Sequence, residues 1–230
     1  MPGLLSHIDL AIEAASAVDK SVINRNFGAF ILGCCAPDIR IITHGLREDT
    51  HFAPITNRVV GTGMESLLKA QPGLANLASL SGATQAFMAG YFSHLVADEA
   101  WIAQVYLPYF DDRDLFGDEV VANICDRAVQ LEMDRQALLK HGGLKSIRSQ
   151  LTNAYVDVEV GFLSMGVLAD WSDWVIGYTQ QEFTWDRLKR LARRQYPKDD
   201  TAAQKAADDF LSNMPYSLER VYDLVPKKVL

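Results

Sequence analysis

Cysteine and proline are scarce in this sequence. Among its 230 residues there are 3 cysteines and 8 prolines. Cys34, Cys35 and Cys125 are an odd number, and a chain of this length can build a core without disulfide bonds. We therefore expect three free thiols that are buried as small apolar side chains, in a protein of a reducing compartment.

Long apolar runs and an excess of positive charge are also missing. No stretch approaches the roughly 20 uninterrupted apolar residues of a membrane-spanning helix. The segment MPGLLSHIDL has no basic region, and polar residues interrupt it, so we expect no secretory signal and a cytoplasmic location. The net charge of −7 would repel the phosphates of duplex nucleic acid. These absences argue against a multi-pass membrane protein and against a duplex-binding protein.

The composition and the hydrophobic pattern favour an all-α fold. Hydrophobic residues make up 49% of the chain and charged residues 22%, as in ordinary globular proteins. Apolar residues recur at helical spacing, and no run alternates strictly between apolar and polar side chains as a strand does. We expect one multi-helix domain over residues 1–230, with the candidate functional residues in residues 1–100 and a helical scaffold in residues 110–230. The later helices are expected over residues 64–70, 82–107, 117–140, 144–161, 164–178, 185–196 and 201–225.

Local signals predict several element boundaries. Ser6 is expected to cap a first helix that begins at His7. The apolar segment FGAFILGCCAPDI is expected to stop at Pro37, because residues before a proline leave the α region. Residues 40–62 are polar and interrupted by glycine, so we expect a long loop over a cleft. Pro108 is expected to end the long core helix.

Histidine is scarce as well, which makes the positions of the 5 histidines informative. His94 and Asp98 lie one helical turn apart in GYFSHLVADEAW, so both side chains can reach one metal ion. The flanking residues are those of a helix core, where an unpaired His or Asp is costly. A metal site explains the pair, and so does a buried His–Asp hydrogen bond that only fixes the packing.

Three further residues are candidates because of their place in the sequence. Asp38 follows the proline-stopped segment and can point into a cleft, although Asp is also a common turn former. His51 lies in the polar segment, and His7 lies in the first turn of the first helix. Each histidine taken alone is better explained as a loop residue or a hydrogen-bonded core residue. The ordered set His, Asp, His and His-x-x-x-Asp is harder to explain by chance.

Four segments resemble the bacterial zinc-dependent phospholipase C family, whose all-helical scaffold is shared with the single-strand-specific nucleases of fungi and plants. They are MPGLLSHIDLAIEAA, GAFILGCCAPDIR, EDTHFAP and GYFSHLVADEAW. The resemblance covers about the first half of the chain. It implies a metal site between core helices, whose ligands are His7, Asp38, His51, His94 and Asp98.

Two features of the family's secreted enzymes have no match in this sequence. Those enzymes use a processed N-terminal Trp as a ligand, and they hold another zinc with two histidines and a glutamate after the His-x-x-x-Asp helix. Here no Trp lies near the start, and His141 is the only histidine after His94. Glu132, with Asp134 near it, is the acidic residue of interest in that region. We expect one or two zinc ions, although manganese, iron or nickel also suit this donor set.

The resemblance implies a metal-dependent phosphoric ester hydrolase, similar to phospholipase C, that acts on a phosphodiester with a metal-bound water as nucleophile. Asp38 would then also be the catalytic residue that orients or deprotonates this water. We expect a small phosphoester or phospholipid substrate and a transient contact with a membrane surface. The expected substrate-binding residues are Phe52, Tyr91 and, more weakly, Glu132, although ordinary core packing explains the two aromatic residues equally well.

Two other functions are compatible with the same residues. One is a nucleotide or single-strand nucleic-acid phosphodiesterase on the same scaffold, against which the acidic net charge argues weakly. The other is a non-catalytic helical protein with a structural metal, which the absence of a second histidine-rich site favours. The sequence predicts no oligomeric state.

Overall fold

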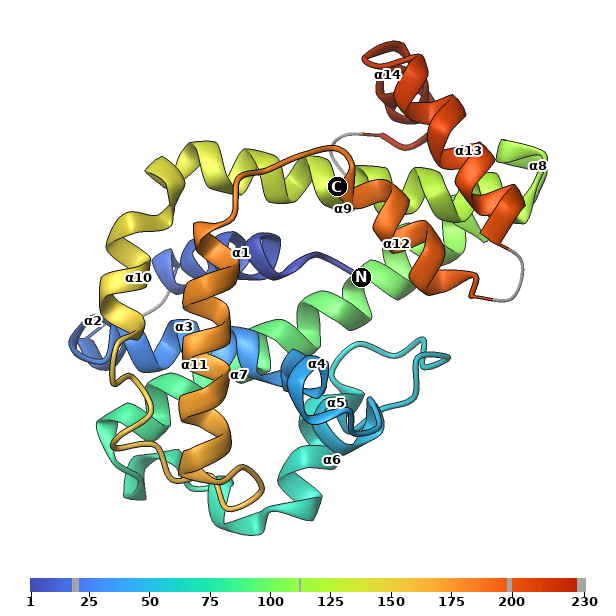
Figure 1. Cartoon of the computed structure of the whole chain (residues 1–230). Coiled ribbons are helices and arrows are strands. Elements are labelled where there is room, and N and C mark those ends of the chain that lie inside the picture. The colour runs from blue at the N-terminus through green and yellow to red at the C-terminus, as the bar shows by residue number, and fades with distance from the viewer. Residues whose placement is uncertain (18–20, 112, 198–199, 227–230) are drawn as a thin grey trace.

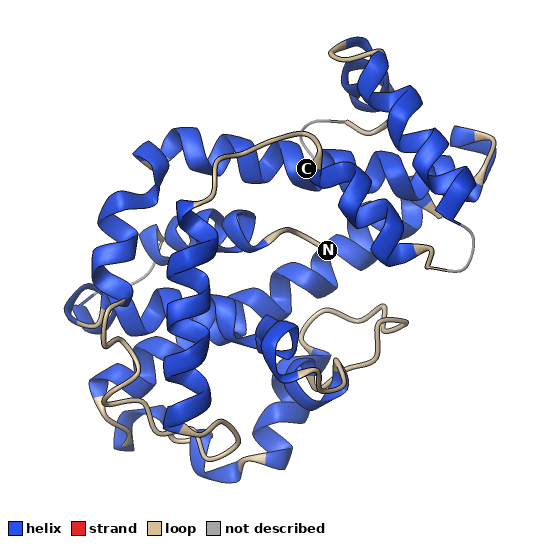
Figure 2. Cartoon of the chain, in the orientation of Figure 1, coloured by secondary structure: helices blue, strands red, loops and turns tan. Residues whose placement is uncertain are grey.

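Helices form all the regular structure in the part of the chain that is described, residues 1–17, 21–111, 113–197 and 200–226 (Figure 2). The structure is a computed structural model, and it confirms the expected all-α class. The α-helices are α1 (Leu4–Ser16), α2 (Ser21–Arg25), α3 (Phe27–Cys35), α4 (Arg40–Thr43), α5 (Glu48–His51), α6 (Thr62–Ala70), α7 (Gly82–Ala100), α8 (Arg113–Phe116), α9 (Glu119–Lys140), α10 (Lys145–Leu151), α11 (Met165–Gln180), α12 (Arg187–Gln195), α13 (Asp200–Ser212) and α14 (Tyr216–Leu224). Shorter 3-10 turns are η1 (Ala36–Ile39), η2 (Pro72–Leu74), η3 (Leu77–Ser79) and η5 (Gly142–Leu144), and η4 (Trp101–Phe110) is π-helical.

The helices pack around two apolar cores that α9 joins (Figure 1). The first core lies between α1, α3, α7, α10 and α11, and its largest buried side chains include Phe87 and Trp171. The second core lies between η4, α12, α13 and α14, with Phe110 and Leu188 at its centre. Helix α9 buries Ala137 in the first core and side chains of its N-terminal half in the second core. One continuous helix therefore belongs to both groups.

Helices α3 and α7 make the most extensive helix pair of the structure, and glycine makes their close approach possible. A β-carbon on Gly33 would lie 2.0 Å from the carbonyl oxygen of Phe87, and one on Gly90 would lie 2.0 Å from the carbonyl oxygen of Phe30. Both distances are far below van der Waals contact, so each helix needs a residue without a side chain where it meets the backbone of the other.

Three expected boundaries are wrong, and each has a local physical reason. Helix α1 begins at Leu4, and Gly3 rather than Ser6 is its capping residue. Pro108 lies inside η4 and does not end it, because the wider π turn leaves room for a ring that would clash in an α-helix. Residues 40–62 are not one loop, since α4 and α5 lie within them.

The second half contains two further differences from the expected elements. Residues 144–161 were expected to be one helix, but α10 ends at Leu151 and turns follow it. Residues 201–225 contain α13 and α14 in place of one helix, and Pro215 lies at the break. The missing amide hydrogen of proline is tolerated there because it precedes the first turn of α14.

The three thiols behave as the sequence predicts. Cys34 and Cys35 are fully buried in α3, Cys125 is buried in α9, and all three are free. Burial raises the pKa of Cys125 to about 12, so this thiol is a core side chain and not a reactive thiolate.

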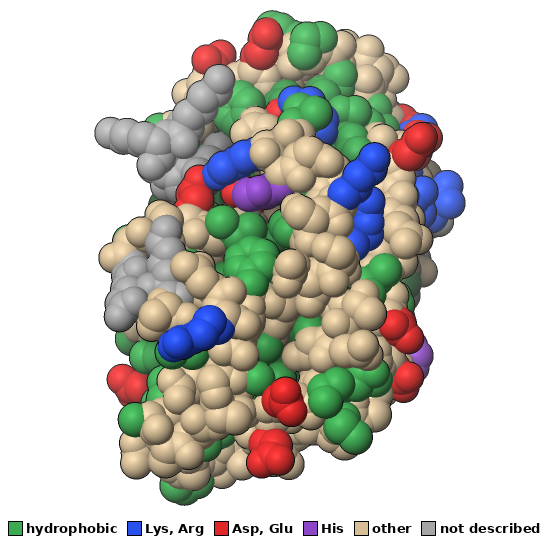
Figure 3. Space-filling view, turned by 90° about the vertical axis from the view of Figure 1, so that its left-hand side faces the viewer, with side chains coloured by type: hydrophobic (Ala, Val, Ile, Leu, Met, Phe, Trp, Pro, Cys, Tyr) green, Lys and Arg blue, Asp and Glu red, His purple; other side chains and the backbone are tan. Residues whose placement is uncertain are grey.

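The surface carries both signs of charge. On the face that Figure 3 shows, acidic and basic side chains are scattered among polar and apolar ones, and no broad basic area is present. In the ranges that the structure describes, no helix has the length and apolar character that a bilayer crossing requires.

The glycine contact between α3 and α7 gives a stability prediction. Gly90→Ala should destabilise the protein by about 1–3 kcal/mol, because its β-carbon meets backbone that cannot move alone. Gly177→Ala in α11 is the matched control, since nothing lies within 4 Å of its β-carbon position. This control should leave the stability unchanged or raise it by up to about 1 kcal/mol. Urea unfolding of both variants measures the difference, and equal midpoints would contradict the packing argument.

Candidate metal centre

One buried carboxylate, that of Asp98, is the centre of the predicted ligand set. Its Oδ1 lies 3.2 Å from Nε2 of His7, and its Oδ2 lies 3.2 Å from Nε2 of His51 and 3.7 Å from Nε2 of His94. Nη2 of Arg47 is 2.7 Å from the same Oδ2. The Asp98 side chain is almost completely buried, and so are all three imidazoles.

Asp38 is the fifth member of the group and the most exposed one. Its Oδ1 is 4.0 Å from Nε2 of His51, and its side chain is 22% exposed, so it faces solvent while the others do not. Two triads have donor atoms within 4.8 Å of one another, one made of His7, His94 and Asp98, and one made of Asp38, His51 and His94. The structure therefore brings together all five residues that the sequence predicts as ligands. Whether they bind a metal stays a prediction.

The close packing of α3 against α7 orients His94. Its Nδ1 lies 2.8 Å from the carbonyl oxygen of Cys34, which directs the proton of the neutral ring to that side. The lone pair on Nε2 then points toward Asp98. The ring of His7, from α1, stacks on that of His94 with centroids 3.7 Å apart and planes 11° apart. A backbone carbonyl that holds the other ring nitrogen is the usual support of a metal-binding histidine.

His51 is held by its own short helix. Nδ1 of His51 lies 3.3 Å from the carbonyl oxygen of Arg47 and 3.3 Å from Oγ1 of Thr50. The hydroxyl of Tyr91 donates to the carbonyl oxygen of Thr50, which ties α5 to α7. Farther along α7, the carboxylate of Glu99 accepts hydrogen bonds from the amides of Gly61 and Gly63. The segment that carries His51 is therefore fixed to α7 at several points.

Asp134 of α9 positions His7 through the start of α1. Its Oδ1 accepts hydrogen bonds from the amide and the hydroxyl of Ser6, at 2.9 and 2.7 Å. A β-carbon on Gly3 would lie 2.3 Å from the Asp134 carboxylate, so the cap fits only a glycine. Burial raises the pKa of Asp134 to about 6, although the hydrogen bonds from Ser6 oppose this shift. The cap of α1 is thus supplied from a distant helix and not by Ser6 as expected.

Several atoms of the centre are buried without a hydrogen-bond partner among the described residues. They are both ring nitrogens of His7, Nε2 of His51 and His94, and Oδ1 of Asp98. The short distances to Asp98 thus lack hydrogen-bond geometry, and the lone pairs face a shared space. Buried polar atoms without partners are costly, and a cation would satisfy all of them. Imidazole nitrogen with carboxylate oxygen is a donor set that zinc accepts, so these residues fit a zinc ion.

The protonation states also suit a cation. Burial lowers the pKa of His7 to about 4 and lowers the pKa of His51, so both rings are neutral at neutral pH. Burial opposes the protonation of His94, but the charge of Asp98 raises its pKa. Burial would raise the pKa of Asp98, yet the surrounding imidazoles hold it well below its usual value. The carboxylate is therefore ionised; Arg47 pairs with its Oδ2, and its Oδ1 remains without a hydrogen-bond partner among the described residues.

A cavity of about 290 Å³ opens beside the two carboxylates. Its charged side chains are those of two aspartates and three arginines, and uncharged residues complete the lining: Asp38, Asp98, Arg40, Arg127 and Arg194, with Met1, Pro2, Ile41, Leu191 and Gln195. No sequence pattern placed these arginines, or Arg47, beside the predicted ligands. The charge of the run RLKRLARR and the position of Arg40 two residues after Asp38 were the only signals that could have indicated them.

The structure does not bring the expected substrate-binding residues to this cavity. Tyr91 is fully buried and hydrogen-bonded in the core, and Phe52 packs edge-on against Phe162. Glu132 binds Arg135 and Gln136 on its own helix. All three are accounted for by packing or local hydrogen bonds, so other residues must contact a ligand that lies beside Asp38.

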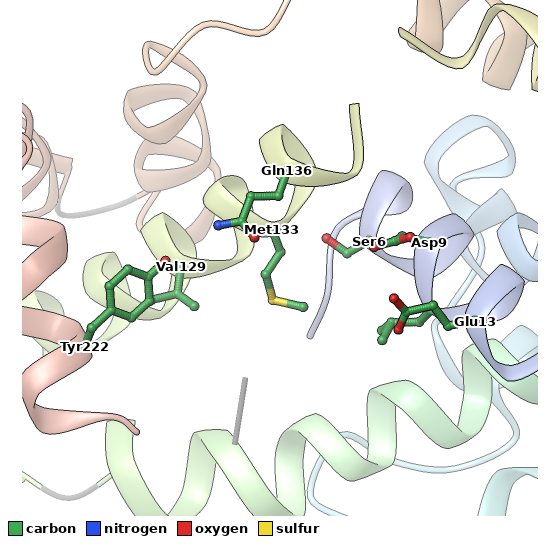
Figure 4. A pocket seen from close by; sticks show the side chains of 8 residues that line it. Ser6, Asp9, Glu13, Val129, Met133, Gln136 and Tyr222 are labelled. Atoms are coloured by element: carbon green, nitrogen blue, oxygen red, sulfur yellow. The ribbon is translucent and has the colours of Figure 1, made fainter. Parts of the chain in front are cut away.

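A second cavity, of about 270 Å³, lies between α1, α9 and α14 and contains none of the predicted ligands (Figure 4). The carboxylates of Asp9 and Glu13 extend toward it from α1. Both are ion-paired with Lys140, and Asp9 also lies 2.8 Å from Nε2 of His141. His141 therefore belongs to a surface ion-pair group and not to the metal centre.

Metal content tests the ligand assignment. Protein prepared with zinc should retain one or two equivalents, and Asp98→Asn or His94→Gln should lower the affinity by at least about tenfold, because each removes a buried donor. His141→Gln is the matched control and should bind as the unchanged protein does. Elemental analysis after dialysis, with circular dichroism to verify folding, measures the result. Zinc retention by both ligand variants would contradict the assignment.

The buried cap of α1 predicts an unusual dependence of stability on pH. Because the folded-state pKa of Asp134 is about 6, above the unfolded value, its ionisation destabilises the fold as pH rises through 6. Asp134→Asn keeps an acceptor for Ser6 and removes this penalty. Relative to the unchanged protein, the variant should gain about 1–3 kcal/mol between pH 5 and pH 7.5 in urea unfolding. An equal difference at both pH values would contradict the shift.

The comparison with known families agrees with this placement of residues. Residues 6–101 match the family described as zinc dependent phospholipase C. This range runs from the start of α1 to the end of α7 and contains all five predicted ligands. No curated protein and no solved structure matches the chain. Over residues 6–101, less than half of its length, the chain is thus similar to the zinc-dependent phospholipase C family.

Proposed function

We propose that this protein is a metal-dependent hydrolase of phosphoric esters, similar to phospholipase C. The observation that carries the proposal is the set of unpartnered donor atoms around Asp98, in a segment that matches the zinc-dependent family. A purely structural hydrogen-bond group would have satisfied these atoms internally. The adjoining cavity supports the same function, because it gives a ligand access to the two carboxylates.

His7, His51, His94, Asp98 and Asp38 would hold the metal. A zinc ion bound there would lower the pKa of a coordinated water toward about 7 and stabilise negative charge on a phosphoryl oxygen. The protein contributes rigidity, since the carbonyl of Cys34 fixes the ring of His94 and the start of α1 is fixed through Asp134. Ligands that are held in advance need little reorganisation during the reaction.

Asp38 is the residue that we assign to proton transfer. It lines the cavity, and its side chain is the one carboxylate of the predicted set that solvent reaches. From this position its free oxygen can accept a proton from a water that approaches the phosphorus atom. Arg40, in the same cavity wall, can bind a non-bridging phosphate oxygen through its guanidinium group.

Hydrolysis of chromogenic esters tests the proposal. Zinc-loaded protein should hydrolyse a nitrophenyl phosphate monoester or diester, and Asp38→Asn should lower kcat by about 100-fold or more, because general base catalysis is lost. Asp9→Asn, which changes a carboxylate of α1 outside the cavity, is the matched control. Turnover by Asp38→Asn at the unchanged rate would exclude its assigned role, and no turnover by the loaded protein would exclude the hydrolase.

A structural metal is the alternative function that the same experiments separate. Chelation of a structural ion should broaden or lower the thermal transition, whereas chelation of a catalytic ion should abolish turnover even where the fold persists. We favour the catalytic role, because Asp38 and the cavity are open to solvent and a structural site is usually closed.

A further inference from the structure

Three guanidinium groups converge on the cavity beside the candidate metal centre. Arg40 follows directly after η1, Arg127 comes from α9, and Arg194 comes from α12. Two of these helices lie after residue 101, outside the segment that matches the family. Two of the three arginines therefore come from the part of the chain that was expected to be only a helical scaffold.

These arginines are not neutralised by carboxylates within the described residues. Arg127 donates to Oε1 of Gln195 at 3.1 Å and to Oε1 of Gln130 at 2.8 Å, and both acceptors are uncharged. Nε of Arg40 is buried and has no hydrogen-bond partner. Other basic residues of α9 and α12 behave differently, since Arg135 pairs with Glu132 and Lys189 with Asp208.

The fixed orientation of Arg127 is that of a binding residue. The two glutamine contacts engage Nε and Nη1, which leaves Nη2 without a hydrogen bond among the described residues. Gln195 also lines the cavity. Its contact therefore holds the Arg127 side chain at the cavity wall. A guanidinium that is held in place by neutral groups retains its full charge for an anion.

The charge balance of the cavity favours more than one negative charge on the ligand. Its lining carries three guanidiniums and two carboxylates, and these carboxylates are the ones predicted to bind a divalent cation. With the cation bound, no lining carboxylate remains to balance the arginines. A phosphodiester brings a single negative charge, whereas a monoester group brings nearly two at neutral pH, because its second pKa is about 6.

A third cavity adjoins the one beside Asp38 and suits the organic part of such a ligand. It measures about 390 Å³, and Arg127 and Gln195 line both cavities. Its wall includes the apolar side chains of Ile102 and Leu107 and the ring of Tyr106. A phosphate held at Arg127 can therefore place an attached apolar or aromatic group in this space.

We propose that Arg40, Arg127 and Arg194 form an anion-binding wall that selects phosphate esters with two or more negative charges over singly charged or zwitterionic diesters. The wall repels a cationic head group and attracts a monoester dianion or a diester that bears a second phosphate. Arg127 and Arg194 are specificity-determining residues for the ester that approaches Asp38. The part of this inference that concerns the reaction rests on the proposed function. The binding of the anion does not depend on it.

Binding measurements test the wall separately from catalysis. The probes are phenyl phosphate, diphenyl phosphate and the zwitterionic diester glycerophosphocholine, titrated by calorimetry into zinc-loaded protein and into protein without added metal. Phenyl phosphate should bind at least about tenfold more tightly than either other probe, because charge-assisted hydrogen bonds to arginine are strong. Equal affinities of phenyl phosphate and glycerophosphocholine would overturn the inference.

Substitutions assign the effect to individual residues. Arg127→Gln should weaken phenyl phosphate binding by about tenfold, and the more exposed Arg194→Gln by about threefold. Arg193→Gln is the matched control, since this exposed neighbour on α12 does not line the cavity. Circular dichroism verifies folding, and Arg194→Gln keeps the test decisive if Arg127→Gln does not fold. Unchanged affinity in Arg194→Gln, or equal losses in it and Arg193→Gln, would overturn the inference.

The outcomes also separate this inference from the proposed function. Selective phosphate binding that depends on Arg127 and Arg194, without any turnover of nitrophenyl esters, supports the wall and removes the hydrolase. Turnover that depends on Asp38, with equal use of charged and zwitterionic esters, supports the hydrolase and removes the wall.

Discussion

The whole arrangement depends on the burial of one negative charge. Asp98 is ionised, nearly inaccessible to water, and in contact with groups from α1, α5 and the residue before α5. A lone buried carboxylate would cost several kcal/mol, so the neighbouring elements are constrained to bring positive or polarisable groups to it. Arg47 supplies one fixed charge on Oδ2, and three imidazoles leave donor atoms unpartnered around the same carboxylate. A divalent cation would satisfy these unpartnered atoms.

The precision of this centre comes from backbone contact and not from the ligands themselves. Gly33 and Gly90 let α3 and α7 approach until the carbonyl of Cys34 reaches the ring of His94. Larger residues at these positions would separate the helices and remove the contact that selects the tautomer of His94. The same principle operates at α1, where the carboxylate of Asp134 occupies the space that a side chain on Gly3 would fill. Small residues therefore determine where the imidazoles lie.

The sequence was sufficient to indicate the helical class and the five residues that lie together, but not the cavity. His94 and Asp98 share a face because their spacing within one helix is local information, and the family pattern added the separated positions. The capping of α1 could not be predicted, because its acceptor lies 128 residues away from Ser6 in sequence. Arg127 and Arg194 were missed for the same reason: nothing local indicates that α9 and α12 pack so that both side chains face Asp38. No local pattern of residues indicates which helices, far apart in sequence, pack against each other.

The proposed function and the proposed anion-binding wall would depend on different parts of the chain. The segment that matches the family carries the five predicted ligands, whereas Arg127 of α9 and Arg194 of α12 lie after it. If both proposals hold, substitutions on α12 would change the preferred ester without moving any imidazole, because none of the predicted ligands lies on that helix. Asp38 would tolerate less change, since it borders both the other predicted ligands and the cavity. Selectivity and reactivity would then depend on different helices, whose side chains meet at the cavity.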